Sequence, residues 1–143
     1  MIKYAISACL CGFNCKYNGK NNLNAKCQRL LEMNEAIIIC PEVMGGLNIP
    51  RKPCEINGHR IINIDGKDCS KEYYDGALMA LEYIKKFKDI DTIILKEKSP
   101  SCGVKYIYDG TFSKTLIKGS GITTSLLKEQ GYKVISEEDL DEL

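Results

Sequence analysis

Three short apolar runs along the chain lack the alternation that marks a half-exposed strand. These runs are Tyr4–Ser7, Ala36–Ile39 and Thr92–Leu95. A short, β-branched run without alternation fits a strand that is covered on both faces, as strands of parallel sheets are. We therefore expect the three segments to pair in one mostly parallel sheet, and residues 133–135 offer a last strand.

Apolar positions near a helical period predict helices between these strands. Residues 23–33 form an amphipathic pattern, and residues 70–88 repeat apolar side chains most regularly, with Ser70 as the expected N-cap. A third helix is expected over residues 122–130, where Gly131 ends it. Each helix lies between two predicted strands, so it can cover a face of the sheet.

Two dipeptides that favour tight turns predict β-hairpins. They are Asn57-Gly58, within residues 55–65, and Asp109-Gly110, between residues 106–108 and 112–117. The order of elements is then strand, helix, strand, hairpin, helix, strand, hairpin, helix, strand. This order predicts a single α/β domain over residues 1–143, with a mostly parallel sheet flanked by helices in Rossmann-like layering and two hairpin excursions.

Composition narrows the class of protein. The chain has 143 residues, of which 44% are hydrophobic and 27% charged, enough for one real core. The net charge is +1 and the basic residues are dispersed, which argues against binding to a nucleic acid duplex. No signal-like or membrane-spanning stretch is present, so we expect a cytoplasmic protein that does not enter a membrane.

The chain carries eight cysteines, which in a reducing compartment point to metal or redox chemistry rather than to disulfides. Cys9, Cys40 and Cys102 each follow one of the three predicted strands. The carboxyl ends of parallel strands meet at one edge, where open α/β sheets bind ligands. Three thiolates there suit an iron–sulfur cluster, and anchoring by three leaves one iron open to an outside ligand.

Two other interpretations of the cysteines stay open. A structural zinc site normally uses Cys-x-x-Cys pairs, whereas the close pairs here are Cys9 with Cys11 and Cys11 with Cys15. A zinc site is therefore possible but less favoured than an iron–sulfur cluster. Free cysteine is also a common small core residue. Cys27 and Cys69 are expected to be of this kind.

A carboxylate accompanies the expected metal site. Glu42 lies two residues after Cys40, in a turn at the same sheet edge, where it can act as a general base toward water. The alternative is a solvated turn carboxylate. His59, the only histidine, adjoins a predicted turn and is expected to be an exposed hairpin residue rather than a ligand.

Several polar groups are candidates for substrate binding. Ser99 and Ser101 can donate hydrogen bonds to a bound ligand, although serine in a proline-containing loop is often only a turn residue. Arg51 and the backbone amides of Gly45 and Gly46 can receive a polar or anionic group. An exposed arginine and an ordinary turn explain these three residues equally well.

Read together, the motifs resemble the thiouracil desulfidase (TudS-type) family over nearly the whole chain. They are Ser7-Ala8-Cys9-Leu10, Tyr17-Asn18-Gly19, Cys40-Pro41-Glu42-Val43-Met44-Gly45-Gly46-Leu47, Pro50-Arg51, Ser99-Pro100-Ser101-Cys102-Gly103 and Ile107-Tyr108-Asp109-Gly110-Thr111-Phe112. The resemblance implies an α/β fold with a 4Fe-4S cluster held by three cysteines, the fourth iron open, and a thiolated nucleobase such as 2-thiouracil as substrate.

Carried over by motif, the resemblance makes Cys9, Cys40 and Cys102 the cluster ligands, with Glu42 and Ser101 as catalytic helpers. The implied reaction is a non-redox desulfidation, in which water activated by Glu42 replaces C=S by C=O and sulfide is released. Two alternatives stay open. One is a sulfur-transfer protein that carries sulfur on a cluster or a persulfide, and the other is a non-catalytic metal-binding or redox module.

The chain also departs from the family pattern. Cys11 stands where many relatives have leucine, and Cys54 lies in a stretch that is more often free of cysteine. These extra thiols can compete for iron, pair as disulfides after cluster loss, or simply pack. Lys16 stands where relatives often carry arginine, which disfavours bidentate recognition of an anion there.

Overall fold

A four-stranded parallel sheet is the centre of the protein in this computed structural model, which describes residues 1–143. Its strands are β1 (Tyr4–Ser7), β2 (Ala36–Ile39), β5 (Thr92–Leu95) and β8 (Lys133–Ser136), in the order β2-β1-β5-β8. All neighbouring strands are parallel and in register, so their carboxyl ends share one edge. The predicted sheet is therefore confirmed, including the last strand.

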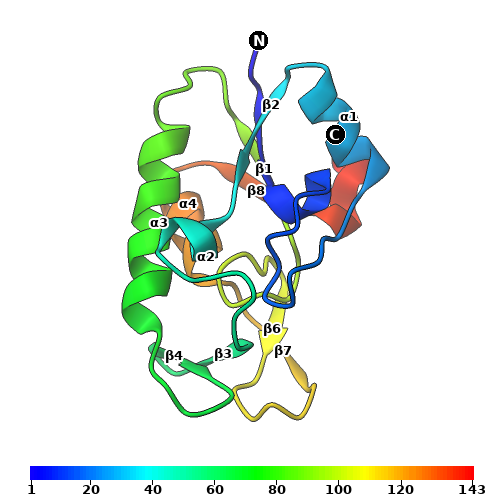
Figure 1. Ribbon diagram of the computed structural model, residues 1–143. Coiled ribbons are helices and arrows are strands. Elements are labelled where there is room, and N and C mark those ends of the chain that lie inside the picture. Colours follow the sequence, from blue (N-terminus) through cyan, green and yellow to red (C-terminus); the bar gives the residue numbers. More distant parts are fainter.

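Helices cover both faces of this sheet (Figure 1). They are α3 (Ser70–Ile84) and α4 (Ile122–Glu129) on one face, and α1 (Ala25–Glu32) with the 3-10 helix η2 (Glu137–Glu142) on the other. Successive strand residues serve the two cores in turn: Ile93 packs in the core with Ala80 and Leu127, whereas Ile94 packs in the core with Cys27. This alternation explains the continuous apolar runs, because both faces of each strand are covered.

Two antiparallel hairpins lie beyond the carboxyl edge of the sheet, in the lower part of Figure 1. They are β3 (Cys54–Asn57) with β4 (Arg60–Asn63), and β6 (Tyr106–Tyr108) with β7 (Leu116–Lys118). In the first hairpin Asn57 pairs with Arg60, so the two turn residues are Gly58 and His59 rather than Asn57 and Gly58. Gly58 adopts the left-handed conformation that this turn needs (φ 66°), and His59 is exposed as expected.

The second hairpin has a longer turn than the sequence suggested. Its return strand begins at Leu116 instead of residue 112, because Phe112 and Lys114 have positive φ angles of 58° and 63° that interrupt an extended chain. The helix α3 also begins differently. Cys69 occupies its N-cap position without a side-chain bond, and the Ser70 hydroxyl instead accepts from the backbone N–H of Ile61 (2.9 Å).

Two short helical segments follow strands directly and were not predicted. The 3-10 helix η1 (Ala8–Cys11) follows β1, and α2 (Pro41–Met44) follows β2, with a proline at its first position, where the missing N–H costs nothing. Each segment begins next to a cysteine of the predicted trio. The turn expected around Glu42 is thus one helical turn, which fixes the direction of that side chain.

The helices α2 and α3 touch backbone to backbone. A Cβ atom added at Gly45 would lie 1.9 Å from the carbonyl oxygen of Glu72, and one added at Gly76 would lie 1.9 Å from that of Pro41. Only glycine allows such an approach at both positions. The contact holds α2, and with it Glu42, against the first turns of α3.

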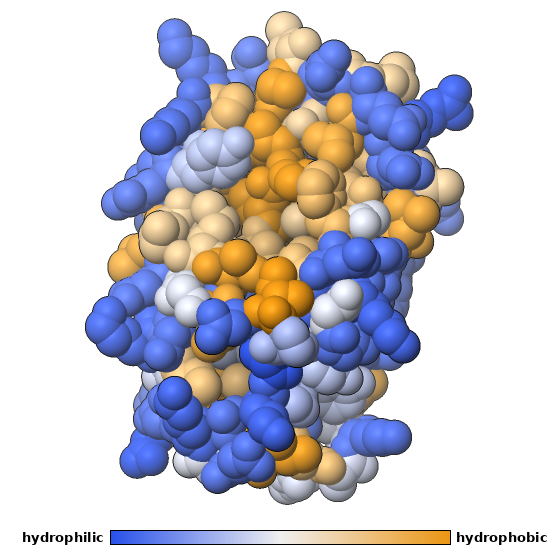
Figure 2. Space-filling model, viewed as in Figure 1, coloured by the Kyte–Doolittle hydropathy of each residue, from blue (hydrophilic) through white to orange (hydrophobic).

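The surface differs between the two halves of the molecule (Figure 2). Apolar side chains form a stripe in the upper half, over the region of the edge strand β2, whereas hydrophilic side chains dominate around the hairpins. None of the helices combines the length and apolar character that a bilayer crossing requires.

Candidate functional site

A cavity of about 470 Å³ opens at the carboxyl edge of the sheet, and residues of the two hairpins complete its wall. The three cysteines of the predicted trio, Cys9, Cys40 and Cys102, all line it. Cys9 comes from η1, Cys40 from the junction of β2 and α2, and Cys102 from the loop after β5. Strand order and parallel pairing therefore bring together thiols that are far apart in the sequence.

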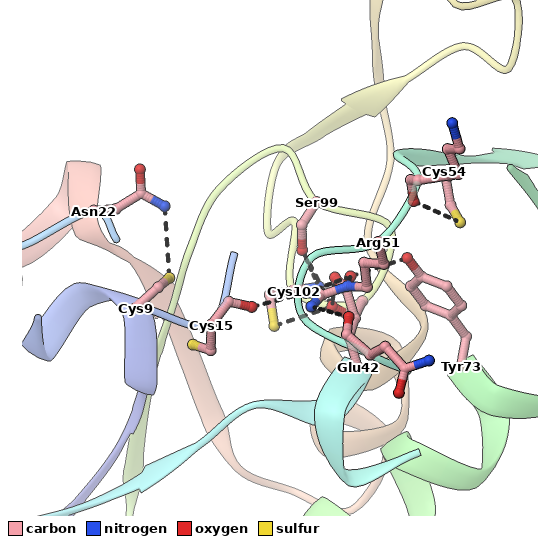
Figure 3. A network of polar contacts seen from close by, with 12 residues as sticks. Cys9, Cys15, Asn22, Glu42, Arg51, Cys54, Tyr73, Ser99 and Cys102 are labelled. Carbon is pink, nitrogen blue, oxygen red and sulfur yellow. Dashed lines mark hydrogen bonds and ion pairs between the residues drawn. The ribbon is translucent and has the colours of Figure 1, made fainter. Parts of the chain in front are cut away.

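Polar groups surround these thiols. The side-chain amide of Asn22 donates to the Cys9 sulfur (3.6 Å), as Figure 3 shows, and the Ser101 hydroxyl oxygen lies 3.4 Å from the Cys102 sulfur. Burial raises the pKa of Cys102 to about 12. No three His, Cys, Asp or Glu side chains are grouped as a single metal ion would require.

A fourth thiol, Cys15, belongs to the same cavity. Its interactions with the sulfurs of Cys40 and Cys9, together with burial, raise the pKa of Cys15 far above the ordinary value, and the interaction with Cys15 lowers the pKa of Cys40 to about 7. Cys15 was not predicted to lie here, because it follows no predicted strand. Cys11, in contrast, is buried outside the cavity wall, where its thiol donates to the Cys27 carbonyl (3.6 Å).

Glu42 is the centre of a network of hydrogen bonds (Figure 3). Its Oε1 atom accepts from the Arg51 Nε (3.1 Å) and from the Tyr73 hydroxyl (3.0 Å). Its Oε2 atom accepts from the Ser101 hydroxyl (2.7 Å). The Glu42 and Arg51 side chains are only 13% and 9% exposed. The solvated turn carboxylate is therefore not what the fold builds, because this carboxylate is held by three side chains.

The candidate binding residues are distributed unevenly. Arg51 lines the cavity, but its donors are engaged by Glu42 and by the carbonyls of Cys15 (2.9 Å) and Asn48 (3.2 Å). The amides of Gly45 and Gly46 donate to carbonyls within the α2 end and do not line the cavity. The structure thus gives Gly45 a packing position against α3 and leaves neither amide free for a ligand.

Ser99 lies in the cavity wall and supports the loop that carries Cys102. Its hydroxyl accepts from the Cys102 backbone N–H (2.7 Å) and lies 3.3 Å from the Ser101 hydroxyl. The same loop is closed by Glu97, a 1% exposed carboxylate whose Oε1 accepts from four backbone N–H groups, at 2.6 Å from Val104 and 3.0 Å from Lys105 among them. Burial raises the pKa of Glu97, but the four N–H groups together lower it by more, so the pKa lies below its usual value.

Two side chains at the site were not found from the sequence. Tyr73 was predicted only as an apolar position of a helix, and its hydroxyl reaches Glu42 because the glycine contact brings α2 and α3 together. Cys54, at the start of β3, also lines the cavity, and its thiol donates to the Lys52 carbonyl (3.7 Å). Neither residue carried a motif signal of its own.

Comparison with known proteins identifies what this arrangement is similar to. A solved structure described as the 4Fe-4S-dependent thiouracil desulfidase TudS superposes with a TM-score of 0.93 at 38% sequence identity, covering 100% of this chain and 95% of that one. The uncharacterized protein YbbK of Bacillus subtilis (strain 168) is 41% identical over 148 residues, covering 96% of this chain and 97% of YbbK. Because residues 4–139 also match the family described as 2-thiouracil desulfurase, the chain belongs to that family.

Proposed function

We propose that this protein is an iron–sulfur-dependent desulfidase that removes sulfur from a thiolated nucleobase such as 2-thiouracil. Water replaces C=S by C=O and sulfide leaves, with no net electron transfer. The observation that carries the proposal is that Cys9, Cys40 and Cys102 line one cavity together with the hydrogen-bonded pair Glu42 and Ser101. Family membership and the likeness to TudS support the reaction class and the substrate class.

The donor set suits an iron–sulfur cluster held by Cys9, Cys40 and Cys102. Thiolate is the ligand that such clusters use, and the cavity wall offers the Cys9 sulfur a hydrogen-bond donor from Asn22. Binding requires each thiol to lose its proton, most expensively at buried Cys102. When bound on three cysteines, the cluster supplies a soft Lewis acid with one open position for a thiocarbonyl sulfur.

The chain's own residues handle the water. The Ser101 hydroxyl contacts both the Oε2 atom of Glu42 (2.7 Å) and the Cys102 sulfur (3.4 Å). It therefore joins the carboxylate to one of the proposed cluster ligands. Glu42 takes the proton of the attacking water at Oε2, and Ser101 orients that water or the carboxylate. Ser99 and Arg51 line the same wall and are the proposed polar residues of the substrate site.

The cavity suits a small heterocycle. Its volume of about 470 Å³ lies in the range of small-molecule sites. Four aromatic side chains line it, and besides the buried Tyr73 these are Tyr17, Tyr108 and Phe112, on which a planar base can stack. The proposed partner is therefore a free thiolated base or a compound that contains one, and not a nucleic acid duplex.

The test begins with anaerobic purification, iron and sulfide analysis, and a visible spectrum. Serine variants of Cys9, Cys40 and Cys102 are expected to lose cluster, whereas Cys27→Ser, a buried thiol outside the cavity, is expected to keep it. The loaded protein should release free sulfide from 2-thiouracil without a protein acceptor, and Glu42→Gln should release it at least 100-fold more slowly, roughly the share of a general base.

Each alternative makes a different prediction. A sulfur-transfer protein would deliver sulfur to an acceptor and release little free sulfide. A non-catalytic module would show no turnover, either as wild type or as Glu42→Gln. Normal cluster content in all three serine variants would refute the proposed ligand set.

A further inference from the structure

We propose that Tyr73 is a positioning residue for Glu42: together with Arg51 it occupies one carboxylate oxygen, so that the other faces Ser101 and the cavity as the working base. This inference rests on the proposed function, because it assigns a role within the Glu42 site. It concerns the hydroxyl group alone, since the Tyr73 ring packs with Ile61 and Cys69 in a small core whether or not the site works.

The Tyr73 hydroxyl has a defined task in the structure. The side chain is 2% exposed, and its hydroxyl donates to Glu42 Oε1 across 3.0 Å (Figure 3). A buried phenol needs a hydrogen-bond partner, and here that partner is the carboxylate. Burial, reinforced by the negative charge of Glu42, raises the pKa of Tyr73 well above its ordinary value, so the phenol stays protonated and remains a donor.

The donors around Glu42 are divided unequally between its two oxygens. Both Arg51 contacts, from Nε and Nη2, reach Oε1 at 3.1 Å, so the guanidinium does not bridge the carboxylate. Tyr73 adds its donor to the same oxygen. The Oε2 atom has one partner, the neutral Ser101 hydroxyl. It is therefore the oxygen with acceptor capacity left for a proton.

A second donor on Oε1 matters because the terminal torsion of a glutamate side chain is soft. Arg51 approaches from the loop after α2, whereas Tyr73 approaches from α3, so the two donors fix the carboxylate plane from different elements. The backbone contact at Gly45 and Gly76 sets the separation of α2 and α3. The fold thus provides a rigid reason why this hydroxyl meets this carboxylate.

The decisive variant is Tyr73→Phe, which removes one oxygen atom and keeps the ring. We expect kcat for sulfide release from 2-thiouracil to fall about 10-fold, the scale of a mispositioned catalytic group, with KM changed less than about 2-fold. Iron and sulfide content should stay at the wild-type level. Tyr74→Phe is the matched control, because it removes the neighbouring hydroxyl, which donates to the His59 carbonyl (3.2 Å) on the exposed side of α3, and should leave kcat unchanged.

Two further measurements separate positioning from a general structural effect. In a double-mutant cycle, Tyr73→Phe should not lower kcat further once Glu42→Gln is present, because the carboxylate that Tyr73 positions is already missing. In infrared difference spectra of the loaded protein, the carboxylate band that Glu42→Gln abolishes should shift in Tyr73→Phe and not in Tyr74→Phe. This readout needs no turnover.

The outcomes are distinct. A wild-type kcat in Tyr73→Phe, an equal loss in the Glu42→Gln background, or an unshifted carboxylate band would overturn the inference. If wild-type protein with a full cluster releases no sulfide, the proposed function fails, and the infrared band still decides whether Tyr73 holds Glu42.

Discussion

Replacing Gly76 by alanine sets two physical effects of opposite sign against each other. Alanine is the better helix former by about 1 kcal/mol, so helix propensity alone predicts a more stable protein. The added Cβ, however, would lie 1.9 Å from the Pro41 carbonyl oxygen. An unstrained carbon–oxygen contact needs about 3.3 Å, so α2 and α3 must separate by roughly 1.4 Å.

The clash should win, because both sides of the contact are backbone and neither can rotate away. Overpacking of this kind costs about 1–3 kcal/mol, and a contact between two backbones belongs at the upper end, about 2–3 kcal/mol, which leaves a net destabilisation of about 1–2 kcal/mol after the propensity gain of about 1 kcal/mol. For a chain of 143 residues this corresponds to a fall in Tm of about 2–8 °C. The separation also moves Glu42 away from Tyr73, and a displacement of about 1 Å at a catalytic group can cost about 100-fold in kcat.

Thermal unfolding followed by circular dichroism and kcat for sulfide release from 2-thiouracil test both parts. Glu82→Ala, on the exposed side of the same helix, is the control and should change neither quantity by much. A Gly76→Ala protein with a raised Tm and an unchanged kcat would refute the reasoning, because it would mean that the α2–α3 contact yields without consequence.

Three other changes test the parts of the fold that hold the site. Glu97→Gln should destabilise the protein by about 2 kcal/mol in urea unfolding at pH 7, since four backbone N–H groups lose a charged acceptor. Because the pKa of Glu97 is lowered in the folded state, that contribution is present above the unfolded-state pKa of about 4.3 and is lost as the pH falls through the lower folded-state pKa, so wild type and variant should converge at acid pH. Glu55→Ala removes the acceptor of the Gly110 (3.0 Å) and Phe112 (3.1 Å) N–H groups, and should cost about 2 kcal/mol and raise KM for 2-thiouracil, whereas an unchanged KM would show that this turn does not shape the cavity. Asn24→Ala removes the N-cap of α1 and should lower stability by about 1 kcal/mol in the same unfolding assay while cluster content stays constant, and a loss of cluster would contradict this separation.

The sequence was informative where local pattern and strand order decide the outcome. The parallel sheet followed from unbroken apolar runs, and the shared edge of β1, β2 and β5 placed Cys9, Cys40 and Cys102 in one cavity. Turn residues were predicted less well. Asn57-Gly58 is a favoured turn pair, but the register of the paired strands moved the turn by one residue.

What the sequence could not provide depends on tertiary approach. Tyr73 occupies an ordinary apolar position of α3, and only the glycine contact with α2 makes its hydroxyl a partner of Glu42. Arg51 was a candidate for ligand binding, and its hydrogen bond to Glu42 could not be foreseen. Such pairings join residues from different elements, and periodicity carries no information about them.

Strand pairing and the loop after β5 bring Cys9 and Cys102 to the same rim, and this has a consequence for the order of events in the cell. An unfolded chain has no preformed place for an inorganic cofactor, so maturation follows folding. By mass action, a group that binds only the folded form also raises its resistance to unfolding. Iron supply would then govern how long the protein survives as well as how fast it works.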